Sequence, residues 1–122
     1  MYTTEIKKIE ATIADYFSGI YFGDIERLET SLSDELVLYG DIKGEFYKKN
    51  VAEYIQGVAG RKSPKELGEI FAMKIVGIDV LGQIAMAKLH LPMLGMNYYD
   101  YVSLAKIEGN WKIVGKIFSH VA

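Results

Sequence analysis

The spacing of the apolar residues changes near Pro64, and this change limits the folds open to the chain. Before Pro64, apolar residues recur every three or four positions, as they do along one face of a helix. After Pro64 they alternate with other residues, as in strands that bury one face. Helices followed by consecutive strands predict an α+β fold, and disfavour a parallel sheet in which strands and helices alternate.

The helical half is expected to hold three helices and one short strand. The first helix ends at Gly19 or Gly23, and the second begins after Asp24, a suitable N-cap. The third follows Asn50, which resembles a capping box with Glu53, and runs to about residue 58. Residues 36–39 are expected to form the short strand. Turn residues follow it: Gly40, Asp41 and Gly44.

The second half is expected to form an antiparallel meander on which the N-terminal helices pack. Its predicted strands cover residues 71–76, 84–91, 98–107 and 111–118, and turn residues lie between each strand and the next. The predicted architecture is therefore an antiparallel sheet with the helices packed against one face, in the α+β class.

The positions of the lysines predict which face of each strand points outward, because a buried unpaired ammonium is costly. This places Lys106 and Lys116 on an outer face, and turns Tyr99, Tyr101 and Ile117 inward, toward the helices. The predicted outer face also carries apolar side chains: Met86, Val102, Leu104, Val114 and Phe118. Soluble monomers rarely expose so large an apolar patch, so a homodimer through the outer sheet face is expected.

Composition excludes several classes of function. The chain has 122 residues, enough for a single domain over residues 1–122, and its 14 basic and 16 acidic residues form no basic stripe, so nucleic acid is not an expected partner. Cysteine is absent and the two histidines have no metal-ligand spacing, so no metal site and no cofactor are predicted. No apolar run is long enough for a membrane span and no signal peptide is visible, so a cytoplasmic protein is expected.

Two segments carry a resemblance to a known superfamily. One is Tyr-Phe-Ser-Gly-Ile-Tyr-Phe-Gly-Asp at residues 16–24, and the other is Asp-Tyr-Val-Ser-Leu-Ala-Lys-Ile-Glu-Gly-Asn-Trp-Lys-Ile-Val at residues 100–114. With the order of helices and strands, they resemble the nuclear transport factor 2-like superfamily, which has a cystatin-like cone fold. The resemblance implies that the helices pack on a strongly curved antiparallel sheet, a cone-shaped α+β barrel. The resemblance is greatest to its putative lumazine-binding branch, near the polyketide cyclase-like (SnoaL-like) and ketosteroid isomerase-like groups.

The resemblance implies some catalytic positions and leaves others unfilled. Tyr16 matches the tyrosine that donates a hydrogen bond to the substrate oxygen in ketosteroid isomerases. The position of their general base is Gly40 here, and the neighbouring Asp41 is expected to point to the other side. Asp100 is close to the position of their protonated pocket aspartate, but the lysine-based assignment turns it outward.

Aromatic residues suggest a ligand pocket. Tyr16, Tyr54, Tyr99 and Tyr101 come from three segments, and all four are predicted to line the interior together with Ile117. The expected function is to bind a small aromatic or polycyclic ligand, with no catalytic residue assigned. Two alternatives stay open: a cofactor-free isomerase, cyclase or dehydratase that uses Tyr16 as donor, and an assembly module with a filled cone.

Overall fold

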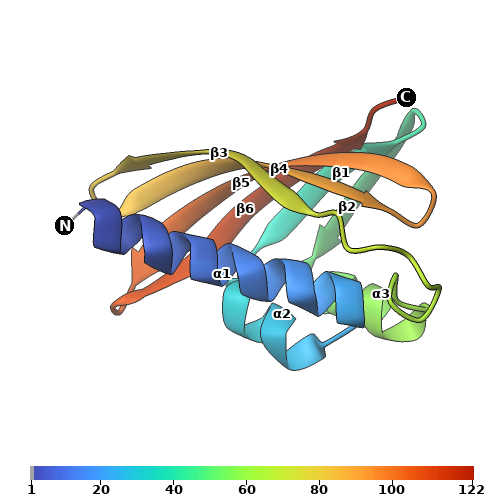
Figure 1. The fold of residues 1–122 in the computed structure, drawn as a ribbon, viewed down its shortest axis with the longest axis horizontal. Coiled ribbons are helices and arrows are strands. Elements are labelled where there is room, and N and C mark those ends of the chain that lie inside the picture. Colours follow the sequence, from blue (N-terminus) through green and yellow to red (C-terminus); the bar gives the residue numbers. More distant parts are fainter. Residues whose placement is uncertain (1) are drawn as a thin grey trace.

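Three helices precede or interrupt a six-stranded sheet in the computed structural model, which describes residues 2–122 (Figure 1). The helices are α1 (Tyr2–Phe22), α2 (Ile25–Ser31) and α3 (Val51–Gly60). The strands are β1 (Val37–Ile42), β2 (Glu45–Asn50), β3 (Lys74–Leu81), β4 (Ile84–Met93), β5 (Met96–Ile107) and β6 (Asn110–His120). The α+β class is confirmed. No helix within the described part of the chain is long and apolar enough to cross a membrane.

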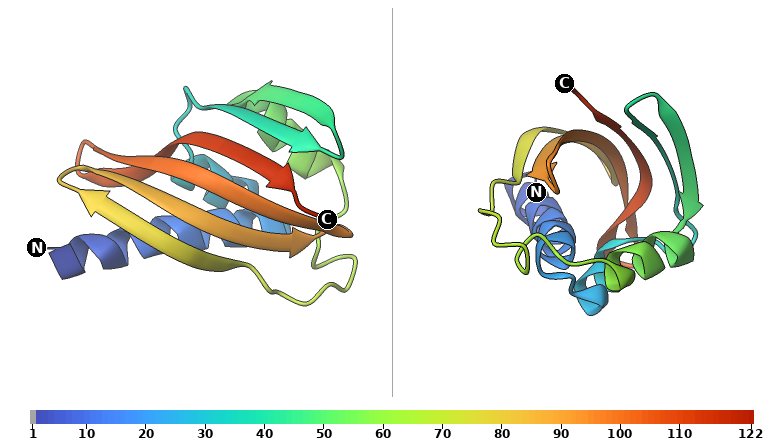
Figure 2. Two further views of the ribbon diagram at one scale, coloured as in Figure 1. Left: turned by 90° about the horizontal axis from the view of Figure 1, so that it is seen from above. Right: turned by 90° about the vertical axis from the view of Figure 1, so that its right-hand side faces the viewer.

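The sheet curves around the helices but does not close into a barrel (Figure 2). Its strand order is β2-β1-β6-β5-β4-β3, so β2 and β3 are its two edges. The expected meander runs from β3 to β6 in antiparallel pairs, whereas β1 pairs with β6 in parallel. The sheet is therefore mixed rather than purely antiparallel.

The hairpin of β1 and β2 differs from the sequence expectation. Gly40 and Asp41 lie within β1, and the turn falls later, at Lys43 and Gly44, which both have positive φ. The strand β2 was missed because its sequence, Glu-Phe-Tyr-Lys-Lys-Asn, is mostly polar, as is typical of a protected edge strand. The predicted capping box of α3 is confirmed, since the side chains of Asn50 and Glu53 each accept from the other's backbone N–H.

The junction of α1 and α2 explains the Gly-Asp pattern at residues 16–24. The close packing of the two helices requires glycine at position 19, because a Cβ there would come within 2.7 Å of Leu28 in α2. Gly23 adopts a φ of 68°, which ends α1 in the left-handed conformation that glycine tolerates. Asp24 then caps α2 by accepting from the backbone N–H of Arg27.

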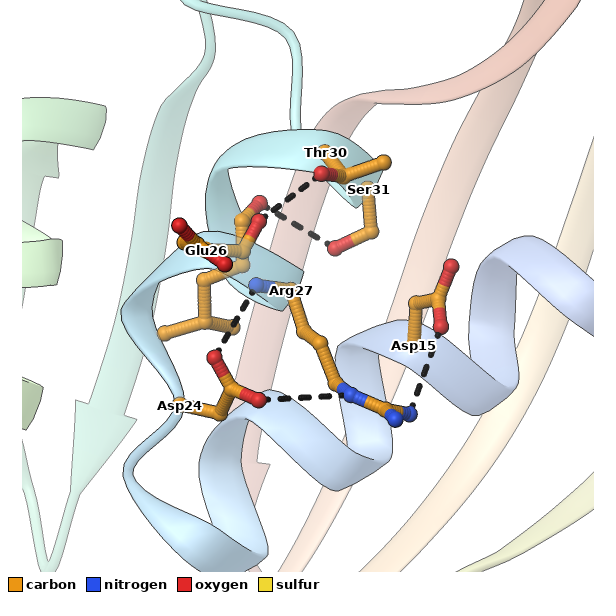
Figure 3. A network of polar contacts seen from close by, with 7 residues as sticks. Asp15, Asp24, Glu26, Arg27, Thr30 and Ser31 are labelled. Carbon is orange, nitrogen blue, oxygen red and sulfur yellow. Dashed lines mark hydrogen bonds and ion pairs between the residues drawn. The ribbon is translucent and has the colours of Figure 1, made fainter.

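Figure 3 shows a polar network on the outside of this junction. The guanidinium of Arg27 lies 3.3 Å from the carboxylate of Asp24 and 3.6 Å from that of Asp15 in α1. All three side chains are exposed, so these ion pairs contribute little to stability. They connect the C-terminal half of α1 with the start of α2.

The lysine-based assignment of faces on β5 is wrong. Asp100, Val102 and Leu104 point inward and are nearly or fully buried, whereas Tyr101 is 50% exposed on the outer face. The assignment failed because it treated Lys106 as unpaired. The ammonium of Lys106 turns inward at the end of the sheet and lies 2.7 Å from Glu5 of α1.

A β-bulge moves the faces of β6. Ser103 pairs with Gly115 but Leu104 pairs with Ile113, so Val114 has no partner on β5. Before the bulge Trp111 and Ile113 point inward, as expected. Beyond it the inward positions are Lys116 and Phe118, while Ile117 is 53% exposed.

These two corrections remove most of the predicted outer patch. Val102 and Leu104 belong to the core, and Phe118 packs against it. Met86 alone among the five is strongly exposed on the outer face. The patch as predicted from sequence is therefore wrong, although other apolar side chains occupy the true outer face.

Candidate functional site

A cavity of about 80 Å³ lies between the helices and one end of the curved sheet. Side chains from α1, β1, β2, β4, β5 and β6 line it, together with α3 and the residue after it. The lining residues are Tyr16, Ile20, Ile42, Tyr47, Tyr54, Arg61, Leu91, Met93, Tyr98, Asp100, Lys116 and Phe118. An apolar space with a few convergent polar groups is the usual form of a small-molecule site.

Tyr16 and Asp100 form the buried polar centre of this cavity. Tyr16 belongs to α1, and its side chain is wholly buried in the core. Its hydroxyl donates a hydrogen bond of 2.6 Å to Oδ2 of Asp100 on β5. The short length is typical of a bond to a charged acceptor. The bond connects α1 to β5, which is an interior strand of the sheet.

Lys116 adds a cation to the same cluster from β6. Its Nζ lies 3.9 Å from Oδ2 of Asp100 and donates to the Tyr54 hydroxyl at 3.3 Å. It also lies over three aromatic rings, those of Tyr16, Tyr54 and Phe118, at 4.3–5.2 Å from their centroids. A buried ammonium is tolerated here because a carboxylate, a hydroxyl and ring faces all surround it.

Burial and charge shift the pKa values of this cluster. Burial raises the pKa of Asp100, although the charge of Lys116 and the hydrogen bond from Tyr16 act in the opposite direction. Burial, with the charge of Asp100, raises the pKa of Tyr16 well above its usual value. For Lys116 burial acts to lower the pKa, but contact with Tyr54 and the charge of Asp100 outweigh it, so the pKa is raised. Tyr16 and Lys116 therefore keep their protons at neutral pH and act as hydrogen-bond donors.

An aromatic wall stands beside the polar cluster. The ring of Phe118 packs edge-on against Tyr47 of β2 and Tyr98 of β5, with centroids 5.3 and 5.8 Å apart. Phe118 also covers Gly40, where an added Cβ would come within 2.2 Å of the ring. The position that holds the general base of ketosteroid isomerases is thus filled by the Phe118 ring, and Asp41 is exposed as expected.

The structure brings only part of the predicted site together. Tyr16 and Tyr54 line the cavity, whereas Tyr99, Tyr101 and Ile117 line a hollow on the outer face of the sheet. The inward orientation predicted for these three residues is wrong, for the reasons given above for β5 and β6.

The lysine positions turned Asp100 and Lys116 outward, although the resemblance placed Asp100 close to a pocket position, and nothing in the sequence singled out Arg61. The first two were assigned to solvent because each was considered alone. A usable signal was present, since an acidic and a basic residue lie within otherwise apolar segments that form neighbouring strands of a hairpin. Such residues can pair across the strands on a buried face.

The histidines take structural roles outside the cavity. Nε2 of His90 lies 2.6 Å from Oδ1 of Asn97, and its ring stacks on Tyr99. Nδ1 of His120 accepts from the backbone N–H of Asn97. Within residues 2–122, no group of three or more histidine and acidic side chains is placed to hold a metal ion.

Similar proteins of known structure share this fold. A nuclear transport factor 2-like protein of unknown function from Silicibacter pomeroyi has a TM-score of 0.86 and 22% identity, covering 99% of both chains. One from Shewanella baltica also has a TM-score of 0.86, with 20% identity over 100% of this chain and 98% of that one. At these identities the likeness establishes the fold alone.

Two sequence matches extend the comparison. The chain is 22% identical over 120 residues to an aldolase, FrzH, from a Cladobotryum species, which spans 95% of this chain and 91% of that protein. The family described as "Putative lumazine-binding" matches residues 4–119. Because the match covers nearly all of the sequence and the fold agrees, the chain belongs to this lumazine-binding-type family of the nuclear transport factor 2-like superfamily.

Proposed function

We propose that the chain binds a small molecule in the cavity between α1, α3 and the sheet. The observation that carries the proposal is the buried cluster of Tyr16, Asp100 and Lys116, which aims polar groups at a space walled by aromatic rings. A filled core would gain stability by replacing such a cluster with apolar side chains. The description of the family, "Putative lumazine-binding", supports a flat aromatic ligand, because a lumazine is a flat ring system.

The cavity limits the size of that ligand. A volume of about 80 Å³ has room for about three water-sized groups, because one water in the liquid occupies about 30 Å³. A larger aromatic or polycyclic ligand would place its polar end against the Tyr16 cluster and extend through the mouth of the cavity. The part of the ligand that is recognised is therefore small.

A thermal-shift screen tests the proposal directly. The panel consists of lumazines and other flavin precursors, steroids and aromatic polyketides. A true ligand stabilises the fold by mass action, by about 2.7 kcal/mol at a hundred times its dissociation constant. No stabilisation by any compound at millimolar concentration would contradict the proposal.

A pair of variants separates cavity binding from surface binding. Ile42→Phe adds a ring to the wall of the cavity, so it is expected to abolish the thermal shift. Ile84→Phe makes the same change at an exposed position of β4 outside the cavity, and the shift should persist. A ligand that stabilises both variants equally binds elsewhere.

An enzymatic proton transfer is the second candidate function, and the inward position of Asp100 favours it. A buried carboxyl with a raised pKa next to a tyrosine donor can hold or move a proton at a bound carbonyl compound. Lys116 remains an ammonium, so it would serve as a hydrogen-bond donor to a developing oxyanion rather than as an amine nucleophile.

Deuterium exchange distinguishes catalysis from binding alone. A carbonyl compound found to bind in the screen is incubated with the protein in D₂O, and incorporation at the carbon next to the carbonyl is followed by mass spectrometry. Exchange that is lost in Asp100→Asn supports the enzyme. Binding without exchange above the buffer rate supports a binding domain.

The outer sheet face supports a homodimer, with residues different from those predicted. Tyr39, Ile117 and Tyr101 stand side by side on β1, β6 and β5, and each is about half exposed. They form a continuous row with Lys88 at its end. Lys88, Tyr101 and Ile117 also line the hollow on this face. A second copy of the chain, related by a two-fold axis, would cover the row with an identical one.

Light scattering and one substitution test the dimer. The expected mass is twice 13.7 kDa. Ile117→Glu should give a folded monomer, because the carboxylate is solvated once the partner leaves. Ile70→Glu, at an exposed position away from the sheet, should remain dimeric. A wild-type mass near 13.7 kDa overturns the proposal.

A further inference from the structure

Arg61 lines the cavity with a guanidinium group, two of whose nitrogen atoms have no hydrogen-bond partner among the described residues. It follows α3 as the C-cap residue and lines the cavity. Its Nε and Nη2 atoms are buried, and neither has a hydrogen-bond partner within the described part of the chain. We infer that the ligand of this cavity is an anion, a small aromatic carboxylate, and that Arg61 binds its carboxylate group. The inference rests on the proposed function and names the class of ligand.

The geometry of the free nitrogens points to a carboxylate. The N–H groups of Nε and Nη2 lie on one edge of the guanidinium and point in the same direction, so they can donate two parallel hydrogen bonds to the two oxygens of a carboxylate. Leaving buried donors of a charged group unpaired is costly. Because arginine stays protonated at all relevant pH values, that cost cannot be avoided by losing the proton.

The charges around the cavity leave one positive charge in excess. Arg61 and Lys116 are cations, and Asp100 is the one carboxylate among the described lining residues. Asp100 already accepts from Tyr16 and faces Lys116, so it cannot also balance Arg61. A ligand with a single negative charge would make the cavity neutral.

The aromatic residues that line the cavity favour an anion whose uncharged part is a flat apolar ring. Phe118 and Tyr98 form the aromatic side of the cavity, next to the cations. Burial raises the pKa of Tyr98, while the charges of Arg61 and Lys116 both act to lower it, so the two cations lie near its hydroxyl. A ring that carries one carboxylate matches this combination of an aromatic wall and a cationic edge.

Calorimetric titration with benzoate and benzamide tests the inference. The two probes have nearly the same size and shape, but only benzoate carries a charge. Benzoate is expected to bind at least about tenfold more tightly than benzamide, since hydrogen bonds to charged groups are the stronger ones. This comparison uses the wild-type protein, so it does not depend on whether any variant folds.

Two matched variants then assign the effect to Arg61. Arg61→Gln is expected to weaken benzoate binding about tenfold or more, and to leave benzamide binding within about twofold. Lys62→Gln removes the same charge at the next, exposed position and should change neither. Arg61→Lys keeps the charge without the paired donors, so it should restore benzoate binding only in part.

The outcomes separate this inference from the proposed function. Equal affinity for both probes, or benzoate binding that Arg61→Gln does not change, overturns the anionic ligand while small-molecule binding stands. If neither probe binds and no compound of the thermal-shift panel stabilises the protein, the proposed function and the inference both fail.

Discussion

The hydroxyl of Tyr16 in α1 donates a 2.6 Å hydrogen bond to the carboxylate of Asp100 in β5, 84 positions further along the chain. This bond places a carboxylate inside the cone next to Lys116, and so creates the polar end of the cavity. Without Asp100, the buried ammonium of Lys116 would have no counter-ion among the described residues that line the cavity.

Tyr16→Phe removes the hydrogen bond while keeping the ring. Because Asp100 is buried and would lose its shortest partner, the free energy of unfolding should fall by about 1.5–3 kcal/mol in urea titrations. Tyr101→Phe removes a half-exposed hydroxyl on the other face and should stay within about 0.5 kcal/mol of the wild type. Equal stability of the two variants would show that the bond contributes nothing.

Asp100→Asn leaves the buried ammonium of Lys116 without a counter-ion. Removing one partner of a buried pair costs about 3–5 kcal/mol, so we expect a loss of this size at pH 7. The double variant Asp100→Asn/Lys116→Met should lose less than the sum of the two single variants, because no unpaired charge remains. Urea unfolding of all four proteins measures the coupling, and additivity within about 0.5 kcal/mol would contradict it.

The raised pKa of Tyr16 predicts a loss of stability at high pH. The folded-state pKa lies above the value of about 10 in the unfolded chain, so the folded state holds the proton more tightly. The stability from this group is fully present below about pH 10, and is lost as the pH rises through the folded-state pKa.

Absorbance at 295 nm measures this ionisation. The difference between the titration curves of the wild type and Tyr16→Phe should contain one step, at a pH well above 10 or at alkaline unfolding. A step at pH 10 or below would mean that the hydroxyl is not buried as described.

Val102→Glu tests the orientation of β5. Val102 is wholly buried, so the glutamate would be an unpaired charge in the core and the domain should unfold, as circular dichroism would show. Tyr101→Glu makes the same charge at the adjacent, half-exposed position and should give a folded protein. A folded Val102→Glu protein with an unfolded Tyr101→Glu protein would reverse the assignment of faces.

The sequence predicted the fold through features that act locally. The change of period near Pro64, the capping box of Asn50 and Glu53, and the two glycines around residues 19–23 each depend on neighbours within a few positions. Together with the two segments that resemble the superfamily, they were sufficient for the fold class and the family.

The site could not be predicted as completely, because it depends on distant partners. Lys106 and Lys116 were assigned to solvent, but Glu5 and Asp100 make their burial possible from other elements. The bulge at Val114 reverses the faces of β6, and its one local signal is the adjacent Gly115, because a glycine within a strand often marks a bulge. The resemblance pointed to both Tyr16 and Asp100, but the inward orientation of Asp100 required the register of the folded sheet.

Methyl NMR titration tests most directly whether the cavity is the binding site. Labelled isoleucine and methionine methyl groups report on both faces when benzoate or a compound of the thermal-shift panel is added. We expect saturable shifts for Ile20, Ile42 and Met93, which line the cavity, and unchanged signals for the outer-face residues Ile84 and Met86. Shifts confined to the outer face, or no saturable shift with any compound, would contradict it.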